Sequence, residues 1–246
     1  MERDIIDKVY IIFGSKSDFE VYESVFKELK QNKVLSTLKT FSAHREPKQL
    51  LEYLSIENPK LIIAGAGLSA ALPGFLASQS DALVIGIPVS ANYSGLDALL
   101  STHQMPSGIP VLGTGVNASK VAAEYAELIF KNKYSKIVLV KRSNAEAIQN
   151  AIKKAEEKLA NEKIPFETIA EPDYGEKDAI YLDFLELEKT KNVDNKGKCV
   201  LFIPVKLDSN EKYSLKLLEL TKKGLWLGLN RGDNAALAAI KVIKQK

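Results

Sequence analysis

Cysteine is almost absent from this sequence: Cys199 is the only one in 246 residues. One thiol cannot form an internal disulfide, which excludes a disulfide-stabilised secreted domain. The chain begins Met-Glu-Arg-Asp, so the apolar stretch of a signal peptide is missing too. We therefore expect a cytoplasmic protein.

Long apolar runs are also missing. The uncharged stretch from Leu61 to Ser80 contains three glycines, a proline and a glutamine, which makes it a poor match to a membrane-spanning helix. No segment is expected to cross a bilayer. A content of 46% hydrophobic and 26% charged residues is that of a globular protein and excludes a disordered chain. The length allows one large domain or two small ones.

Positive charge is absent from one long region. Residues 61–119 contain no Lys or Arg, and their only charged residues are Asp81 and Asp97, which indicates a deep core or a subunit interface. Residues 1–130 hold 11 Lys and Arg against 14 Asp and Glu, a net −3, and residues 131–246 hold 23 against 17, a net +6. The charges of the second half alternate in sign, as in Lys153–Lys158, which favours a solvated helix face over a nucleic-acid surface.

Strand-like and helix-like segments alternate through the first half of the chain. The expected strands are Val9–Phe13, Leu35–Phe41, Lys60–Ala64, Ala82–Pro88 and Pro110–Gly113, and the expected helices are Phe19–Lys30, Pro47–Leu54, one ending near Ala77, Gly95–Ser101 and Ala118–Phe130. This alternation predicts an α/β fold with a parallel sheet covered by helices on both faces. Ligands bind such sheets at the carboxyl ends of the strands.

The second half repeats this order in weakened form. Lys136–Val140 aligns with Lys8–Phe13 at an offset of 128, whereas Pro204 lies 116 residues after Pro88, so about twelve residues are missing from the second copy. We also align Asp233-Asn234-Ala235 with Val116-Asn117-Ala118. The interpretation is a tandem duplication, with a domain at 1–130, a linker at 131–135 and a second, structural domain at 136–246. The alternative is that any two α/β domains share such a rhythm.

Two loops carry residues suited to an anionic ligand. Gly14-Ser15-Lys16-Ser17-Asp18 follows the first strand, and its amides and hydroxyls suit a phosphate, with Asp18 available for sugar hydroxyls. The alternative is that Ser17 or Asp18 is a helix N-cap. After the second strand, His44 could move a proton near neutral pH and Arg45 could bind a phosphate, although a lone histidine is more often structural.

A third loop, from Ala64 to Gly74, is made of small residues. Close approach of its backbone to a ligand would suit a carboxylate or carbon dioxide; tight helix packing is the alternative. Residues 90–110 form a long connection that could cover a site or join subunits. His103 lies within it without an evident partner, and we expect it to be exposed to solvent or to an interface.

Taken together, six ordered motifs resemble the N5-carboxyaminoimidazole ribonucleotide mutase family, also called PurE. The motifs are Gly14–Asp18, Ser42–Arg45, Ala64–Gly74, Ile87–Val89, Gly95–Leu99 and Gln104–Val111. The resemblance covers residues 7–130. It implies a flavodoxin-like three-layer αβα fold, octamers with sites at subunit junctions, no metal and no organic cofactor. The implied reaction moves a carboxyl group from N5 to C4 of an aminoimidazole ribonucleotide in purine biosynthesis.

The resemblance also implies roles for single residues. Ser15, Ser17 and Arg45 would bind the substrate phosphate, Asp18 the ribose hydroxyls, and His44 would carry the proton at C4. The substrate-binding set is completed around the migrating carboxylate and the loops by Gly14, Ser42, Ala43, Ala64, Gly65, Ala66, Gly67 and Leu72.

The match to the mutase branch is incomplete, and other functions stay open. Ala71 stands where that branch commonly has a histidine. The carboxylase branch usually has Lys at the place of Arg45, so the mutase branch remains the nearer relative. The alternatives are a carboxylase that uses carbon dioxide directly and a non-catalytic nucleotide-binding regulatory subunit. An FMN-binding protein is disfavoured because it has no use for the histidine–arginine pair. The second copy contains no histidine. Four chains are expected to form one particle in place of the family octamer. No nucleic-acid or membrane partner is expected.

Overall fold

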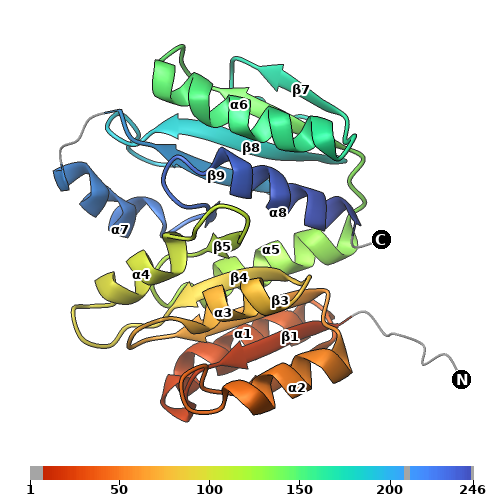
Figure 1. Cartoon of the computed structure of the whole chain (residues 1–246), viewed down its shortest axis with the longest axis vertical. Helices are drawn as coiled ribbons and strands as arrows, with labels where there is room; N and C mark the ends of the chain where they lie inside the picture. The colour runs from red at the N-terminus through yellow and green to blue at the C-terminus, as the bar shows by residue number, and fades with distance from the viewer. Residues whose placement is uncertain (1–7, 208–210, 245–246) are drawn as a thin grey trace, which may run out of the picture.

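The protein is described here from a computed structural model, which covers residues 8–207 and 211–244. Figure 1 shows strands and helices alternating along the chain, with the two halves stacked one above the other. The predicted domains 1–130 and 136–246 include residues 1–7, 208–210 and 245–246, which lie outside the described residues. No helix of the described ranges is long and apolar enough to cross a membrane.

The elements of the first half follow the predicted order. They are β1 (Val9–Phe13), the short 3₁₀ helix η1 (Lys16–Asp18), α1 (Phe19–Gln31), β2 (Ser36–Thr40), α2 (Pro47–Glu57), β3 (Leu61–Ala66), α3 (Leu72–Gln79), β4 (Leu83–Pro88), α4 (Leu96–His103), β5 (Val111–Gly113) and α5 (Ser119–Lys131). The five strands and five α-helices expected from the sequence are confirmed, with ends shifted by a few residues.

The second half has fewer helices. It consists of β6 (Lys136–Lys141), α6 (Glu146–Asn161), β7 (Phe166–Ile169), β8 (Ala179–Glu186), β9 (Val200–Val205), η2 (Glu211–Lys216), α7 (Leu217–Leu220), β10 (Leu225–Trp226) and α8 (Gly232–Lys244). Residues 170–178 and 187–199, where the first half has α2 and α3, form no helix. The gap of about twelve residues inferred from the two sequence offsets lies between Val140 and Pro204, the part of the chain that contains these two segments.

The ten strands found in the described ranges belong to one sheet, in the order β2-β1-β3-β4-β5-β10-β9-β8-β6-β7. Within the first half this is the order 2-1-3-4-5 of flavodoxin, and its strands are parallel. Read from the other edge, β7-β6-β8-β9-β10 gives the same order, again parallel. The α/β class is confirmed. The matching order supports the tandem duplication, which stays a prediction.

The two halves meet at an antiparallel pairing that the sequence did not predict. Trp226 of β10 pairs with Gly113 of β5, so the strands of the second half run opposite to those of the first. The Trp226 side chain is fully buried and stacks against Phe202, with ring centroids 5.2 Å apart. The sheet is thus parallel within each half and reverses its direction once.

One face of the sheet carries a core that runs through both halves. Alternate strand residues, such as Ile11, Ile85, Leu201 and Leu139, point to this face, where α1, α5, α8 and α6 cover them. The other face is divided. Under α2 and α3 lies a core of the first half, whereas in the second half loop residues, Tyr174 among them, fill the space left by the missing helices.

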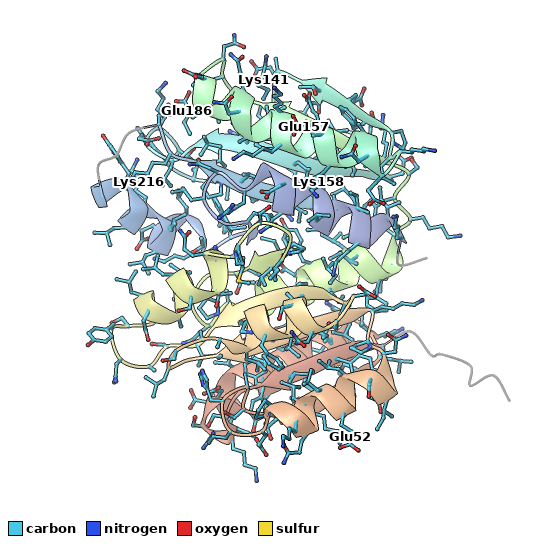
Figure 2. The ribbon with its side chains drawn as sticks, in the orientation of Figure 1. Glu52, Lys141, Glu157, Lys158, Glu186 and Lys216 are labelled. Atoms are coloured by element: carbon cyan, nitrogen blue, oxygen red, sulfur yellow. The ribbon has the colours of Figure 1, made fainter. Side chains whose placement is uncertain are left out.

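The charge-poor region contains the middle of the sheet. Strands β3 and β4 are buried along their whole length, and β5 lies at the centre beside β10, which explains why residues 61–119 contain so few charges. The charge run Lys153–Lys158 behaves as expected of a solvated helix face. Glu157 is exposed and Ala155 is buried against the core (Figure 2).

Hydrogen bonds from the second half fix a turn of the first. The Asn234 side chain, 1% exposed, donates to the Pro106 and Ile109 carbonyls at 2.8 and 3.4 Å and accepts the Gly108 amide hydrogen at 2.9 Å. The neighbouring Asp233 accepts the Ser107 hydroxyl. Since these contacts join α8 to the segment before β5, the halves form one packed unit.

The strand-to-helix junctions of the two halves correspond differently from the predicted alignment. Asn117 and Asn230 both have a positive φ, 55° and 61°, and donate their backbone amides to Pro88 and Pro204. Each side-chain oxygen accepts the amide hydrogen that follows its neighbouring strand, from Ser90 and from Lys206. Asn117 therefore matches Asn230. The predicted alignment of Asn117 with Asn234 was wrong, because it followed similar residue types and not the place of the asparagine in the strand-to-helix junction.

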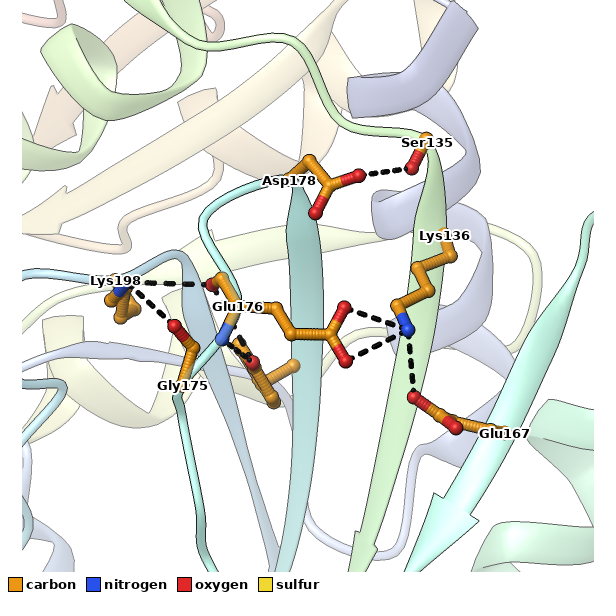
Figure 3. A network of polar contacts seen from close by, with 8 residues as sticks. Ser135, Lys136, Glu167, Gly175, Glu176, Asp178 and Lys198 are labelled. Carbon is orange, nitrogen blue, oxygen red and sulfur yellow. Dashed lines mark hydrogen bonds and ion pairs between the residues drawn. The ribbon is translucent and has the colours of Figure 1, made fainter.

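The segment after α5 is fixed to the second half. Ser135 donates its amide and hydroxyl to Asp178, and Lys136 lies between two carboxylates, 3.0 Å from Glu167 and 2.6 Å from Glu176 (Figure 3). The residues just before Ser135 are held by the end of α5, because Asn132 Nδ2 and Tyr134 Oη both donate to the Leu128 carbonyl at 2.9 Å. This is where the sequence predicts a linker.

His103 is not exposed as predicted. It is 2% exposed, and its Nε2 lies 2.9 Å from the Thr114 carbonyl. A Cβ on Gly113 would come within 2.4 Å of the ring, and one on Gly228 within 2.5 Å of the His103 carbonyl, so the histidine fills the junction between the halves. Burial lowers the pKa of His103 to about 4 and keeps the ring neutral at pH 7.

Candidate active site

A cavity of about 870 Å³ opens where the strands of the first half end. Every strand of that half contributes the segment that follows it or its last residue, as expected where the chain switches direction in a doubly wound sheet. The lining residues are Gly14, Ser15, Ser17, Asp18, Phe19, Glu20, Val21, Ser42, Ala43, His44, Arg45, Ala66, Gly67, Leu68, Ser69, Ala71, Leu72, Val89, Ser90, Ala91 and Asn117.

The loop after β1 is held by its own serines. Ser15 is the N-cap of η1 and accepts the Ser17 amide hydrogen at 3.2 Å. The Ser17 hydroxyl lies 2.8 Å from Ser15 Oγ and 3.1 Å from a carboxylate oxygen of Asp18. Asp18 occupies the N-cap position of α1 but makes no capping bond. The capping bond is thus made by Ser15 and not by Ser17 or Asp18, the two residues of the alternative, and both of these line the cavity.

Asp18 is the residue of this loop whose carboxyl pKa is shifted by its surroundings. Partial burial raises the pKa of its carboxyl, and the hydrogen bond from Ser17 lowers it. The carboxylate has an oxygen left for a ligand, because Ser17 contacts only one of the two. This geometry suits hydrogen bonds from vicinal hydroxyls.

The loop after β2 is a turn built on Ser42. Its hydroxyl accepts the Arg45 amide hydrogen at 3.3 Å, its carbonyl accepts that of Glu46 at 2.8 Å, and its own amide donates to the Glu46 carboxylate at 3.1 Å. Ser42 is buried, whereas His44 and Arg45 are exposed and line the cavity. The turn thus fixes its backbone through Ser42 and leaves the imidazole and the guanidinium for a ligand.

The third predicted loop is shorter than expected. Ala64, Gly65 and Ala66 belong to β3, and only Gly67 to Ala71 form a loop before α3. Ala64 is fully buried and Gly65 faces the Phe13 ring, where a Cβ would lie 2.0 Å from the nearest ring atom. Neither residue lines the cavity, whereas Ala66 and Gly67 do. The extended pairing of β3 with β1 and β4 explains the difference.

Small residues line the cavity where β3 ends. The atom nearest to a Cβ on Gly67 would be the Val89 carbonyl oxygen at 3.4 Å, and Ala71 and Leu72 line the same cavity. The family's common histidine would extend from the position of Ala71 at this wall. Of the predicted site residues, all except Ala64 and Gly65 line one cavity.

Some lining residues were missed by the sequence analysis. Val89, Ser90 and Ala91 follow β4, and Asn117 follows β5. The signal that could have found them is their position, because they end the next two strands of the predicted parallel sheet. Among the described residues, no group of three His, Cys, Asp or Glu side chains could hold a metal ion.

The same edge of the second half is filled by its own side chains. Asp183 occupies the sheet position of Ala64, as the pairings Ile12 with Ala64 and Val140 with Asp183 show at the offset of 128. By the same register Leu185 stands for Ala66, and Glu186 follows it where Gly67 stands in the first half. Figure 2 shows Glu186 and Lys141 at this edge.

An ion pair occupies the centre of that edge. Arg142, in the position of Gly14, donates Nε and Nη2 to the two oxygens of Asp183 at 2.8 and 2.6 Å. The Tyr174 hydroxyl donates to the same carboxylate at 2.5 Å. Asp183 is fully buried, and burial together with the nearby carboxylate raises the pKa of Tyr174. Where the first half leaves room for an anionic ligand, the second half therefore places its own carboxylate.

Comparisons with known proteins find a matching family and similar enzymes. The family model described as AIR carboxylase matches residues 8–151. The N5-carboxyaminoimidazole ribonucleotide mutase of Pyrococcus abyssi is 44% identical over 134 residues, 53% of this chain and 77% of the relative. That of Saccharolobus solfataricus is 38% identical over 149 residues, 59% of this chain and 94% of the relative.

Among solved structures, the crystal structure of Treponema denticola PurE is similar at 29% sequence identity. It covers 63% of this chain and 93% of the other, with a TM-score of 0.47. The family match ends in α6, so it includes β6 and part of the following helix as well as the first half. Because the match spans more than half of the sequence, the chain belongs to the AIR carboxylase family.

Proposed function

We propose that this protein is an N5-carboxyaminoimidazole ribonucleotide mutase, an enzyme of purine biosynthesis. The observation that carries the proposal is the gathering of His44, Arg45, Ser15, Ser17 and Asp18 around one cavity, in a chain whose relatives bear that name. The enzyme acts on a small ribonucleotide and works in the cytoplasm.

The residue types support a division of tasks. Ser15, Ser17 and Arg45 bind the phosphate through hydroxyl and guanidinium donors, and Asp18 accepts hydrogen bonds from the ribose. The ring then lies toward His44 and the backbone of Ala66 and Gly67. The alternative of a general FMN-binding protein has no task for His44.

The reaction exchanges a carboxyl group and a proton between the exocyclic amine nitrogen N5 and the ring carbon C4. The bond from N5 to the carboxyl carbon breaks, carbon dioxide leaves, and the electron pair remains on N5, which takes a proton from His44. C4 then adds to the carbon dioxide and loses its hydrogen as a proton to His44, which restores the proton that His44 gave up. The small floor at Gly67 keeps the carbon dioxide close to the ring between the two steps.

Purified protein supplied with N5-carboxyaminoimidazole ribonucleotide should form the C4-carboxylated product. In parallel, aminoimidazole ribonucleotide with bicarbonate tests the carboxylase reaction, whose enzyme from Candida albicans is 46% identical over 120 residues, 47% of this chain and 21% of that protein. Turnover only with the second mixture would replace the mutase by the carboxylase. Binding without turnover of either would select a regulatory subunit.

The second half serves as a structural domain in this proposal. The Arg142–Asp183 pair and the side chains of Leu185 and Glu186 fill the edge that corresponds to the cavity. Titration of the substrate should therefore saturate at one molecule per chain, and two per chain would contradict this role.

Four chains should assemble into one particle, each supplying two of the eight positions of the family octamer. Two halves with the same strand order in each chain support this arrangement. Light scattering should give a mass near four times 27.1 kDa. A single-chain mass, or full activity of residues 1–130 alone, would contradict it.

A further inference from the structure

A second hollow, of about 470 Å³, lies next to the candidate active site. It is lined by Gly14, Ser15, Lys16, Thr40, Arg45 and Glu46, and it shares Gly14, Ser15 and Arg45 with the larger cavity. The two hollows therefore meet at the loop after β1 and the guanidinium of Arg45. The family resemblance gives no role to Lys16 or to Thr40.

The charges around this hollow are unbalanced in favour of cations. Lys16 and Arg45 both line it, are both exposed, and form no ion pair with any other part of the described chain. Glu46 is the acidic group of the lining, and its carboxylate accepts the Ser42 amide hydrogen at 3.1 Å. Two cations against one engaged carboxylate leave the hollow with a net positive charge.

The hydrogen-bonding groups of the loop point to the same kind of ligand. Ser15 Oγ accepts the Ser17 amide hydrogen, so its own hydroxyl hydrogen can be donated to an anion. Thr40 is a second hydroxyl-bearing residue of the lining. An ammonium, a guanidinium and two hydroxyls are the donor set that a phosphomonoester dianion requires, because it brings two negative charges and three acceptor oxygens.

We propose that Lys16 is a specificity-determining residue, which binds the phosphate of the ribonucleotide together with Arg45 where the smaller hollow meets the larger cavity at Ser15. This rests on the proposed function for the identity of the nucleotide, but not for the chemistry of the phosphate. The ribose and the ring then occupy the larger cavity, where Asp18 and His44 lie.

The test uses the full chain and the probes inorganic phosphate, ribose 5-phosphate and ribose, titrated by calorimetry or NMR. Lys16→Met should weaken ribose 5-phosphate about tenfold and leave ribose unchanged, and Lys16→Arg should keep most of the affinity. Lys48→Met is the matched control, since Lys48 is an exposed lysine nearby on α2 that lines neither hollow. Added salt should reduce the effect because the group is exposed.

Equal affinities of Lys16→Met and wild type, or an equal loss in Lys48→Met, would overturn the proposal. So would a wild-type chain that binds none of the phosphate probes. In the mutase assay Lys16→Met should raise KM with kcat unchanged. Lys16-dependent phosphate binding without any turnover would overturn the proposed function alone, and turnover with a KM independent of Lys16 would overturn this inference alone.

Discussion

The two halves of the molecule share a scaffold and differ at the ends of their strands. Both have the strand order 2-1-3-4-5, and both close the last crossover with an asparagine of positive φ, Asn117 or Asn230, bonded in the same way. Only the first half has the serine loop, the His44–Arg45 turn and small residues at the end of β3. Features present in both halves therefore belong to the scaffold, and the candidate site is built from features that the first half alone has.

The comparison also shows that the same strand order can exist without the cavity-lining loops. At the position of Ala64 stands Asp183, and a carboxylate there is tolerated because Arg142 and Tyr174 satisfy both of its oxygens. Two helices are missing from the same face, and side chains of the loops take their place. The common face, under α1, α5, α8 and α6, is kept in both halves.

The largest expected effect is on turnover, which should depend on the strand-end edge of the first half and not on the same edge of the second half. His44→Asn should reduce mutase turnover about a thousandfold with little change in substrate affinity, because the imidazole acts on the proton in the chemical step. Steady-state kinetics and a binding titration measure the two quantities. Glu171→Gln, an exposed residue after the corresponding strand β7, is the control and should keep full turnover. Unchanged turnover of His44→Asn would contradict the assignment of His44 as the proton carrier.

The next effect tests whether Asp183 belongs to the fold of the second half. Asp183→Asn should lower the free energy of unfolding by about 3 kcal/mol, since it leaves Arg142 and Tyr174 without their shared carboxylate. Denaturant titration measures the loss. Glu167→Gln, at a surface ion pair with Lys136, should cost less than about 0.5 kcal/mol. Similar losses in both variants would show that the buried ion pair stabilises the fold no more than the surface ion pair does.

A smaller effect tests whether the two halves unfold together. Asn234→Ala should lower the free energy of unfolding by about 2 kcal/mol, because the Pro106, Gly108 and Ile109 backbone groups lose their partner. The transition should remain single if the halves unfold together, and two separate transitions in wild type would show that they are independent. Tm and the denaturant slope report on both points.

The smallest effect concerns His103 at the junction. Its pKa in the folded chain is about 4, below the ordinary 6.5, so the unfolded chain binds more protons between these values. This contribution to stability is complete above pH 6.5 and is lost as the pH falls toward 4. His103→Gln, whose amide can still donate to the Thr114 carbonyl, should reduce the loss between pH 7 and pH 5 by about 1 kcal/mol. Identical pH profiles of the two chains would contradict it.

Much of the first half could be predicted because its signals are local. The β-branched run Val9–Phe13, the serine loop that ends it and the periodicity from Phe19 each define an element without help from distant residues. The site residues Ser15, Asp18 and His44 follow from the rule that parallel strands present their carboxyl ends to a ligand. Where β3 ended was not predictable, because its last residues are held by pairing with β1 and β4.

The sequence by itself determined the α/β alternation, the loops that line the cavity and the weak repeat of the second half, since each depends on the spacing of residue types along the chain. Only the tertiary structure decided that β10 pairs antiparallel with β5, that His103 is buried between the halves and that Arg142 meets Asp183. These contacts join residues far apart in sequence. Their formation depends on packing volume and on the pairing of buried charges, for which a single sequence carries no local signal.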